Sequence, residues 1–166
     1  MKRSTFCDMP CPVAQSLERI GEWWTLLIVR EAFLGQRRFG DFQQRLGIAK
    51  NVLSTRLRKL VEEGILERRV SSEDAREVEY RLTDKGRDLM PVLLALAQWG
   101  ERWIYKGRSP LRYRNRHTGA ELVRLAPRDR DGVELAPRDL EIVRKDAAPT
   151  LKPAAGRRAG ARSGTR

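Results

Sequence analysis

Residues 37–82 contain the pattern that most restricts how this chain can fold. Apolar residues recur at helical spacing on both sides of a tight turn at Leu46-Gly47-Ile48, and strand-like segments follow Gly64 at residues 65–70 and 78–82. A glycine often ends a helix, and two short strands joined by a polar loop form a hairpin. The pattern therefore predicts two helices and a two-stranded wing, the outline of a winged helix-turn-helix.

The second helix of this pair has one apolar and one polar face. Its apolar face consists of Leu53, Leu57, Leu60 and Val61, while residues 50–59 hold four cations and no acid. Such a face favours a polyanionic partner, and Asn, Ser, Thr and Arg side chains can reach both base edges and phosphates. A merely solvated helical face is the alternative. The side chains that we expect to contact DNA are Lys50, Asn51, Ser54, Thr55, Arg56, Arg58 and Lys59.

Further arginines lie before the helix pair and in the predicted wing. Acidic residues interleave with those of the wing, so only one or two of its arginines are expected to hold phosphates. The candidates are Arg37, Arg38, Arg68, Arg76 and Arg81.

Several motifs occur in a fixed order and together resemble a known family. They are Cys11-Pro12-Val13, Trp-Thr-Leu-Leu from Trp24, Arg-Arg-Phe from Arg37, Leu-x-x-Arg-Leu-x-x-Leu from Leu53 and Tyr-x-Leu-Thr-x-x-Gly from Tyr80. Over roughly residues 7–104 the chain is similar to the HxlR-type bacterial transcriptional regulators. The resemblance implies a homodimeric winged-helix protein that binds double-stranded DNA, with a fold like that of the MarR group.

Three features depart from the family pattern. Trp23 adds an indole beside Trp24, which either enlarges the core or, with Trp99, forms an effector pocket. Ala49 stands where a serine usually caps the recognition helix, and alanine accepts no hydrogen bond from the first-turn amides, so the start of the helix is expected to depend on Asn51 or on DNA. The chain also continues for about sixty residues beyond Trp103.

This extension carries most of the excess charge. The formal net charge is +12, of which residues 1–107 contribute +4 and the last 59 residues +8. Thr118-Gly119 and Asp131-Gly132 are hairpin-turn signals. We predict a DNA-binding and dimerisation domain at residues 1–107, a small β-rich appendage at 108–146 and a disordered basic tail at 147–166 that strengthens DNA binding or serves solubility.

Apolar helical stripes on both sides of the DNA-binding unit predict a homodimer, although such helices also complete monomer cores. The first stripe contains Val13, Leu17 and Ile20. The second consists of Leu89, Leu93, Leu96 and Trp103, in a helix expected over residues 84–105 with Pro91 in its early turns. We therefore expect a mainly α fold (α+β) with flanking dimerisation helices.

Cys11 is the candidate redox sensor. It directly precedes a helix, whose positive end favours a thiolate, and Cys7 could resolve an oxidised Cys11. In oxidant-sensing members of the family a cysteine in this context is the reactive group, while a buried cysteine without a sensory role is the alternative. A thiol oxidoreductase is disfavoured because Cys-x-x-x-Cys is not the redox motif.

The remaining function classes find little support in the residues. His117 and the two cysteines do not supply a zinc ligand set, and we find no phosphate loop or nucleophile elbow, so we expect no metal, no cofactor and no enzyme activity. No apolar run reaches membrane-spanning length, which predicts a cytoplasmic, nucleoid-associated protein. The sequence thus predicts a sequence-specific regulator, with repression as the expected sign; an architectural DNA-binding protein is the alternative.

Overall fold

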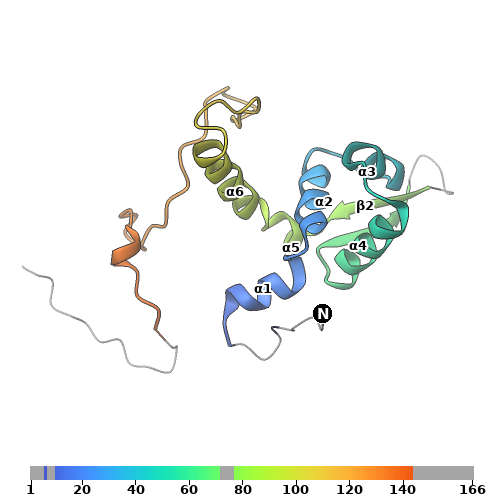
Figure 1. Cartoon of the computed structure of the whole chain (residues 1–166), viewed down its shortest axis with the longest axis horizontal. Helices are drawn as coiled ribbons and strands as arrows, with labels where there is room; N and C mark the ends of the chain where they lie inside the picture. The colour runs from blue at the N-terminus through green and yellow to red at the C-terminus, as the bar shows by residue number, and fades with distance from the viewer. Residues whose placement is uncertain (1–5, 7–9, 72–76, 144–166) are drawn as a thin grey trace, which may run out of the picture. The chain divides into compact units, whose positions relative to one another are not determined.

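The computed structural model describes residues 6, 10–71 and 77–143, and the order of its elements is that of a winged helix-turn-helix (Figure 1). The fold is mainly α with a two-stranded wing, as predicted. The elements are α1 (Pro12–Ile20), α2 (Trp23–Phe33), α3 (Phe39–Leu46), α4 (Lys50–Glu62), β1 (Leu66–Val70), β2 (Val78–Leu82), α5 (Asp84–Arg87), α6 (Met90–Trp103) and a short 3-10 turn, Pro137–Asp139.

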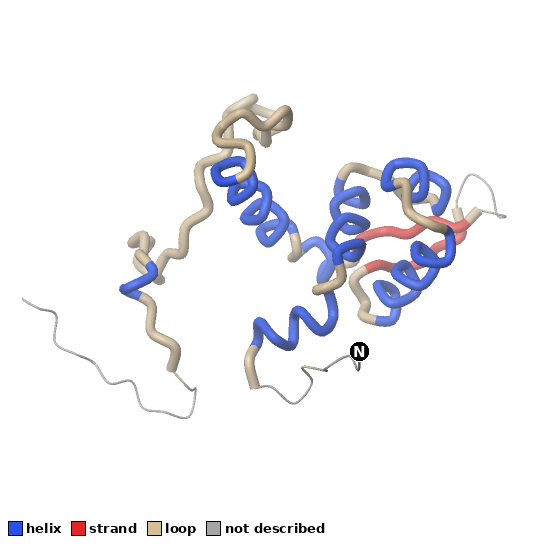
Figure 2. Tube along the Cα trace, in the orientation of Figure 1, coloured by secondary structure: helices blue, strands red, loops and turns tan. Residues whose placement is uncertain are grey.

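The core lies where α2, α3 and α4 meet the wing, and Figure 2 shows these helices gathered around the two strands. Helical spacing brings Leu53, Leu57 and Leu60 onto one side of α4, and all three are buried. They pack in one cluster with Phe42 of α3 and Ile28 of α2. The apolar face predicted for the recognition helix therefore fixes α4 to the body and leaves the opposite side outward.

The turn between α3 and α4 depends on Gly47. This residue has a φ of 60°, in the left-handed region, and its N–H donates to the carbonyl oxygen of Gln43 at 2.9 Å. A side chain is disfavoured in this conformation, so glycine sets the angle at which the chain turns into α4.

The wing is an antiparallel pair in which Leu66 faces Leu82 and Val70 faces Val78. Its first strand begins one residue later than predicted. The segment before α3 runs along the other edge of β2, because the N–H of Tyr80 donates to the carbonyl oxygen of Arg37 at 2.7 Å. The wing is therefore held from two sides, by β1 and by the residues that lead into α3.

The single helix expected over residues 84–105 is wrong, because two helices occupy this range. The first, α5, ends at Arg87, and α6 begins at Met90 with Pro91 in its first turn. Proline has no N–H to donate and fits the first turn of a helix better than its interior. Pro91 therefore begins a new helix instead of kinking a longer one.

The appendage has the predicted turns but less strand than expected. Gly119 and Gly132 both have positive φ, and each turn closes a single antiparallel bridge, Arg114 with Glu121 and Arg128 with Glu134. Among described residues 108–143 no strand longer than such a bridge forms, so the expected β-rich appendage is turn-rich instead. Charged residues interrupt the apolar alternation that would pair longer strands.

The chain divides into two compact units at a different place from the predicted boundary. Residues up to Leu125 belong to the first unit and those from Ala126 to the second. The predicted basic tail, residues 147–166, lies outside the described residues. No described helix is both long and apolar enough to cross a membrane.

Candidate nucleic-acid interface

The outward side of α4 carries five polar side chains at helical spacing. Because the three core leucines occupy the opposite side, this face is exposed to solvent. On this face the hydroxyl of Thr55 donates to the carbonyl oxygen of Asn51, one turn earlier in the same helix, at 2.9 Å. The exposed face, called here the outward face of α4, consists of Lys50, Asn51, Ser54, Thr55 and Arg58.

The start of α4 adds backbone donors to this face. Ala49 is the N-cap residue and provides no side-chain hydrogen bond, because a methyl group cannot accept one. The first amides of a helix have no partner within the helix, and their positive end favours anions. Lys50 and Asn51 lie directly at this end, so the geometry suits a phosphate next to the bases that the helix faces.

Arg56 and Lys59 differ from the sequence expectation, because they point away from the outward face of α4. The Nη2 atom of Arg56 lies 2.9 Å from Oε2 of Glu22, at the N-cap of α2, and the side chains are only 20% and 27% exposed. The Nε atom of Arg56 is buried with no hydrogen-bond partner among the described residues. Lys59 donates from Nζ to the carbonyl oxygen of Glu18 at 3.0 Å.

These contacts tie the recognition helix to the corner between α1 and α2. A third contact joins Arg19 of α1 to Glu63 at the end of α4, with 3.4 Å between Nε and Oε2. The spacing contains a signal for the direction of Arg56, which lies three residues after Leu53 and four before Leu60 and so shares their side of the helix. The ion pair itself could not be predicted, because no sequence motif identifies Glu22 as the partner of Arg56.

The two arginines before α3 lie at the edge of the wing. Arg37 is exposed, whereas Arg38 pairs through Nε with Oε2 of Glu77 at 2.9 Å. Arg38 is also the N-cap residue of α3, and its backbone forms an antiparallel β-bridge with that of Glu79. The structure thus brings the start of α3 next to the wing, on which Arg68 is exposed; Arg76 lies outside the described residues.

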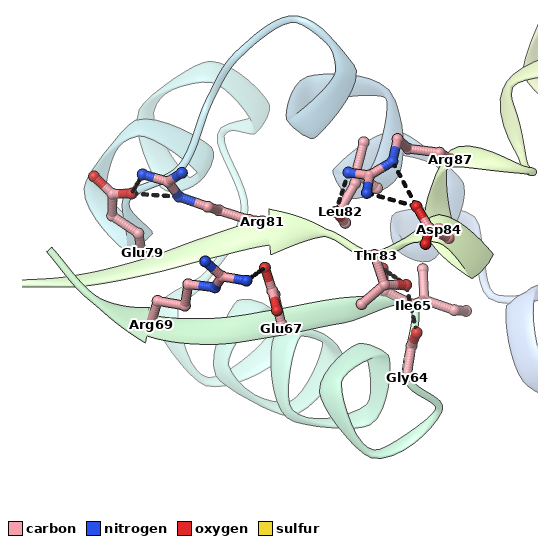
Figure 3. A network of polar contacts seen from close by, with 10 residues as sticks. All are labelled: Gly64, Ile65, Glu67, Arg69, Glu79, Arg81, Leu82, Thr83, Asp84 and Arg87. Atoms are coloured by element: carbon pink, nitrogen blue, oxygen red, sulfur yellow. Dashed lines mark hydrogen bonds and ion pairs between the residues drawn. The ribbon is translucent and has the colours of Figure 1, made fainter.

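One face of the wing is a cluster of alternating charges (Figure 3). Arg81 donates from Nε to Glu79 Oε2 at 2.8 Å, and Arg69, another arginine of the wing, pairs with Glu67 at 2.8 Å. The hydrogen bond from Arg81 holds the pKa of Glu79 below its usual range, against the opposing effect of desolvation, and the charges of Arg37 and Arg38 add to this lowering. Arg81 is therefore partly neutralised before any phosphate arrives.

The redox and effector candidates belong to α1, α2 and α6 and not to α4 or the wing. Cys11 is a half-buried free thiol at the N-cap of α1, and Cys7 lies outside the described residues. Trp24 packs against the core, whereas Trp23 and Trp99 are 87% and 58% exposed. None of these three indoles lines the cleft beside α6 that is described next.

A cleft of about 770 Å³ lies between α2, α6 and the segment after α6. Its lining includes Leu26 and Leu27 of α2, Leu93 of α6 and Ile104, the C-cap residue of α6. Sequence reasoning missed this cleft, because its walls come from segments separated by more than sixty residues. Within the described parts of the chain, no group of His, Cys, Asp and Glu side chains could hold a metal ion.

Comparison with known proteins agrees with this architecture. The sequence model of the HxlR-like helix-turn-helix family matches residues 19–108. An uncharacterised HTH-type transcriptional regulator of Mycobacterium tuberculosis, Rv3095, is 47% identical over 109 residues, which are 66% of this chain and 69% of that protein.

Two solved structures extend the comparison. The crystal structure of PA1607, described as a candidate transcription factor, is 46% identical with a TM-score of 0.79 and covers 85% of this chain and 99% of its own. The redox regulator HypR in its reduced form is 32% identical with a TM-score of 0.52, covering 58% of this chain and 99% of its own. The chain therefore belongs to the HxlR-like helix-turn-helix family and is a transcriptional regulator with a helix-turn-helix DNA-binding domain.

Proposed function

We propose that the protein is a homodimeric repressor that reads an inverted-repeat operator. The observation that carries this proposal is the outward face of α4, which combines an amide, two hydroxyls and two cations, all on exposed side chains. Asn can bond two atoms of adenine and Arg two atoms of guanine in the major groove. Lys50 and the exposed wing arginine Arg68 would hold phosphates and fix the register.

The dimer is supported by the apolar side of α6. This helix has no buried residue, although Val92, Leu96, Trp99 and Trp103 recur at intervals of four, three and four residues and are 41% to 60% exposed. Such spacing forms a seam against a second helix. We call these four residues the α6 seam, and two copies joined there would present two recognition helices to successive major grooves.

A thiol response is supported by the place of Cys11. Its half-buried side chain stands at the positive end of α1, and α1 is the helix to which α4 is tied through Lys59 and Arg19. Oxidation of Cys11 would displace the start of α1 and, through these contacts, disturb α4. Working on DNA, the regulator would act in the cytoplasm at the nucleoid.

Selection of bound sequences from a random DNA pool tests the proposal. The purified, reduced protein should enrich an inverted repeat, with discrimination over unrelated DNA of roughly 10³ or more. Asn51→Ala and Arg58→Ala should lower this discrimination, whereas Arg116→Ala, at an exposed arginine in a turn after α6, should not. A pool without any enriched motif would refute operator recognition and favour an architectural protein that uses its basic C-terminal region.

Repetition after mild oxidation tests the thiol response. The motif should disappear for the wild-type protein and persist for Cys11→Ser. Loss of the motif in both proteins would exclude Cys11 as the sensor, and its persistence in both would turn attention to a small-molecule effector.

A further inference from the structure

The segment that follows α6, residues 109–125, forms a short hairpin without a core of its own. The N–H of Asn115 donates to the carbonyl oxygen of Ala120 at 2.8 Å, and the side-chain oxygen of Asn115 accepts from the N–H groups of His117 and Thr118. Every residue from 110 to 125 is nevertheless exposed. A lone two-stranded hairpin is marginally stable in water, so this segment, called here the arm, needs a surface to pack against.

The arm carries more apolar surface than a solvated loop needs. Its large apolar side chains are between 42% and 84% exposed, Leu122 and Val123 marking these limits. Exposed apolar side chains gathered in one short segment mark a contact with another molecule. The full set is Leu111, Tyr113, Leu122, Val123 and Leu125.

Gln98 fixes the arm to α6. Its Nε2 atom donates to the carbonyl oxygen of Val123 at 3.0 Å, and its Oε1 atom accepts from the N–H of Leu125 at 2.8 Å. Both ends of one side-chain amide therefore hold the arm's backbone as a neighbouring strand would. The arm thereby contributes to the lining of the 770 Å³ cleft, which includes Leu111 and Leu122 of the arm as well as Leu26 and Leu27 of α2.

The chemistry of the cleft favours an apolar occupant. Its two arginines are already paired, Arg30 with Glu31 and Arg112 with Glu121, the latter at 2.9 Å. No unpaired arginine therefore remains in the lining to attract an anionic small molecule. Half of the residues that line the cleft are leucine, isoleucine or tyrosine, which are common in the core of a protein interface.

The α6 seam indicates what the occupant is. Leu96 belongs to the seam and also lines the cleft, so the two surfaces are continuous. A partner that packs against the seam therefore contacts the edge of the cleft at Leu96. We propose that the second copy of this chain fills the cleft and that the arm closes over it as an intersubunit clasp. This inference rests on the proposed homodimer, because the seam selects the partner.

Photo-crosslinking of the full-length protein tests the clasp. We would replace Leu122, which lines the cleft, with p-benzoylphenylalanine and mix ¹⁵N-labelled with unlabelled protein until subunits have exchanged. Irradiation should give covalent dimers whose linked peptides join labelled with unlabelled chains and map to α2 or α6. The same substitution at Arg116, in the turn of the arm, is the control and should crosslink far less.

The outcomes separate the clasp from the dimer. Linked peptides of one isotopic form only, or a lack of crosslinks in a protein that sediments as a dimer, would overturn the clasp and leave the dimer standing. A protein that sediments as a monomer at every concentration would overturn both.

A substitution experiment gives a second measure. Leu122→Asp with Val123→Asp should raise the dimer dissociation constant about tenfold or more by sedimentation equilibrium, since two apolar contacts become charged. Trp99→Asp should disrupt the dimer through the seam, and Arg116→Asp should leave it intact. Far-ultraviolet circular dichroism verifies that each variant is folded. A dissociation constant unchanged by the arm variant, together with disruption by Trp99→Asp, would refute the clasp alone.

Discussion

Replacing Glu22 with Gln should destabilise the protein and weaken operator binding without changing which bases are preferred. Glu22 is not on the outward face of α4, yet its carboxylate lies 2.9 Å from Nη2 of Arg56. The substitution keeps the shape of the side chain and removes its charge. Arg56 then keeps a mostly buried guanidinium, whose Nε already lacks a hydrogen-bond partner among the described residues.

The magnitude follows from the exposure of the pair. Breaking a fully buried ion pair costs about 3–5 kcal/mol, whereas an exposed pair contributes about 0–1 kcal/mol. Arg56 and Glu22 are 20% and 27% exposed, between these limits. We therefore expect the free energy of unfolding to fall by about 1–2 kcal/mol. The loss of operator-binding free energy should not exceed the energy needed to return α4 to its place. The dissociation constant for the operator should therefore rise by no more than roughly tenfold.

A double-mutant cycle measures the pair directly. Glu22→Gln, Arg56→Gln and the double variant would be compared by urea unfolding and by operator titration, and the two sites should couple by about 1 kcal/mol. Arg58→Gln is the matched control. Arg58 is 72% exposed and lies 3.8 Å from Glu62, so stability should change by less than about 0.5 kcal/mol while base preference changes.

The reasoning would be refuted by one combination of results. If Arg56→Gln left stability unchanged but altered base preference, Arg56 would contact DNA itself, as the sequence pattern indicated. Absence of coupling in the cycle would show that Glu22 does not position α4.

Three further predictions follow from single residues. Glu79→Gln should reduce the loss of stability on acidification. Because the pKa of Glu79 is lowered on folding, its ionised carboxylate stabilises the folded state above the unfolded-state pKa near 4.5, and this stabilisation is lost as pH falls through the folded-state pKa. The free energy of unfolding should therefore depend less on pH in the variant over this acid range. Gly47→Ala should destabilise by about 1 kcal/mol through backbone strain alone, because nothing lies within 4 Å of the added Cβ, and Gly47→Asn should cost less; thermal unfolding measures both. Thr83→Ala should loosen the junction of α4, wing and α5, because the Thr83 hydroxyl donates to the carbonyl oxygen of Gly64 and accepts from the N–H of Gly86, and faster amide exchange of Gly86 would report it.

The sequence predicted the helix-turn-helix and wing because these elements are specified locally. Leucines at helical spacing, Gly47 at the turn and Gly64 at the end of α4 each act within a few residues. The break at Pro91 was harder to predict, because proline is compatible both with a kink and with a new helix start. The arm was harder still, since turn signals predict where the chain reverses but not how many residues pair on either side.

What the sequence determined by itself is the identity and order of the elements and the composition of the surface offered to DNA. What only the tertiary structure decided is the partner of each charged side chain. Arg56 and Arg58 are two residues apart and chemically identical, yet one is tied to Glu22 and the other faces solvent. The physical reason is that helical spacing fixes where a side chain leaves its own helix, whereas packing of distant segments, here the corner of α1 and α2 against α4, fixes what it meets.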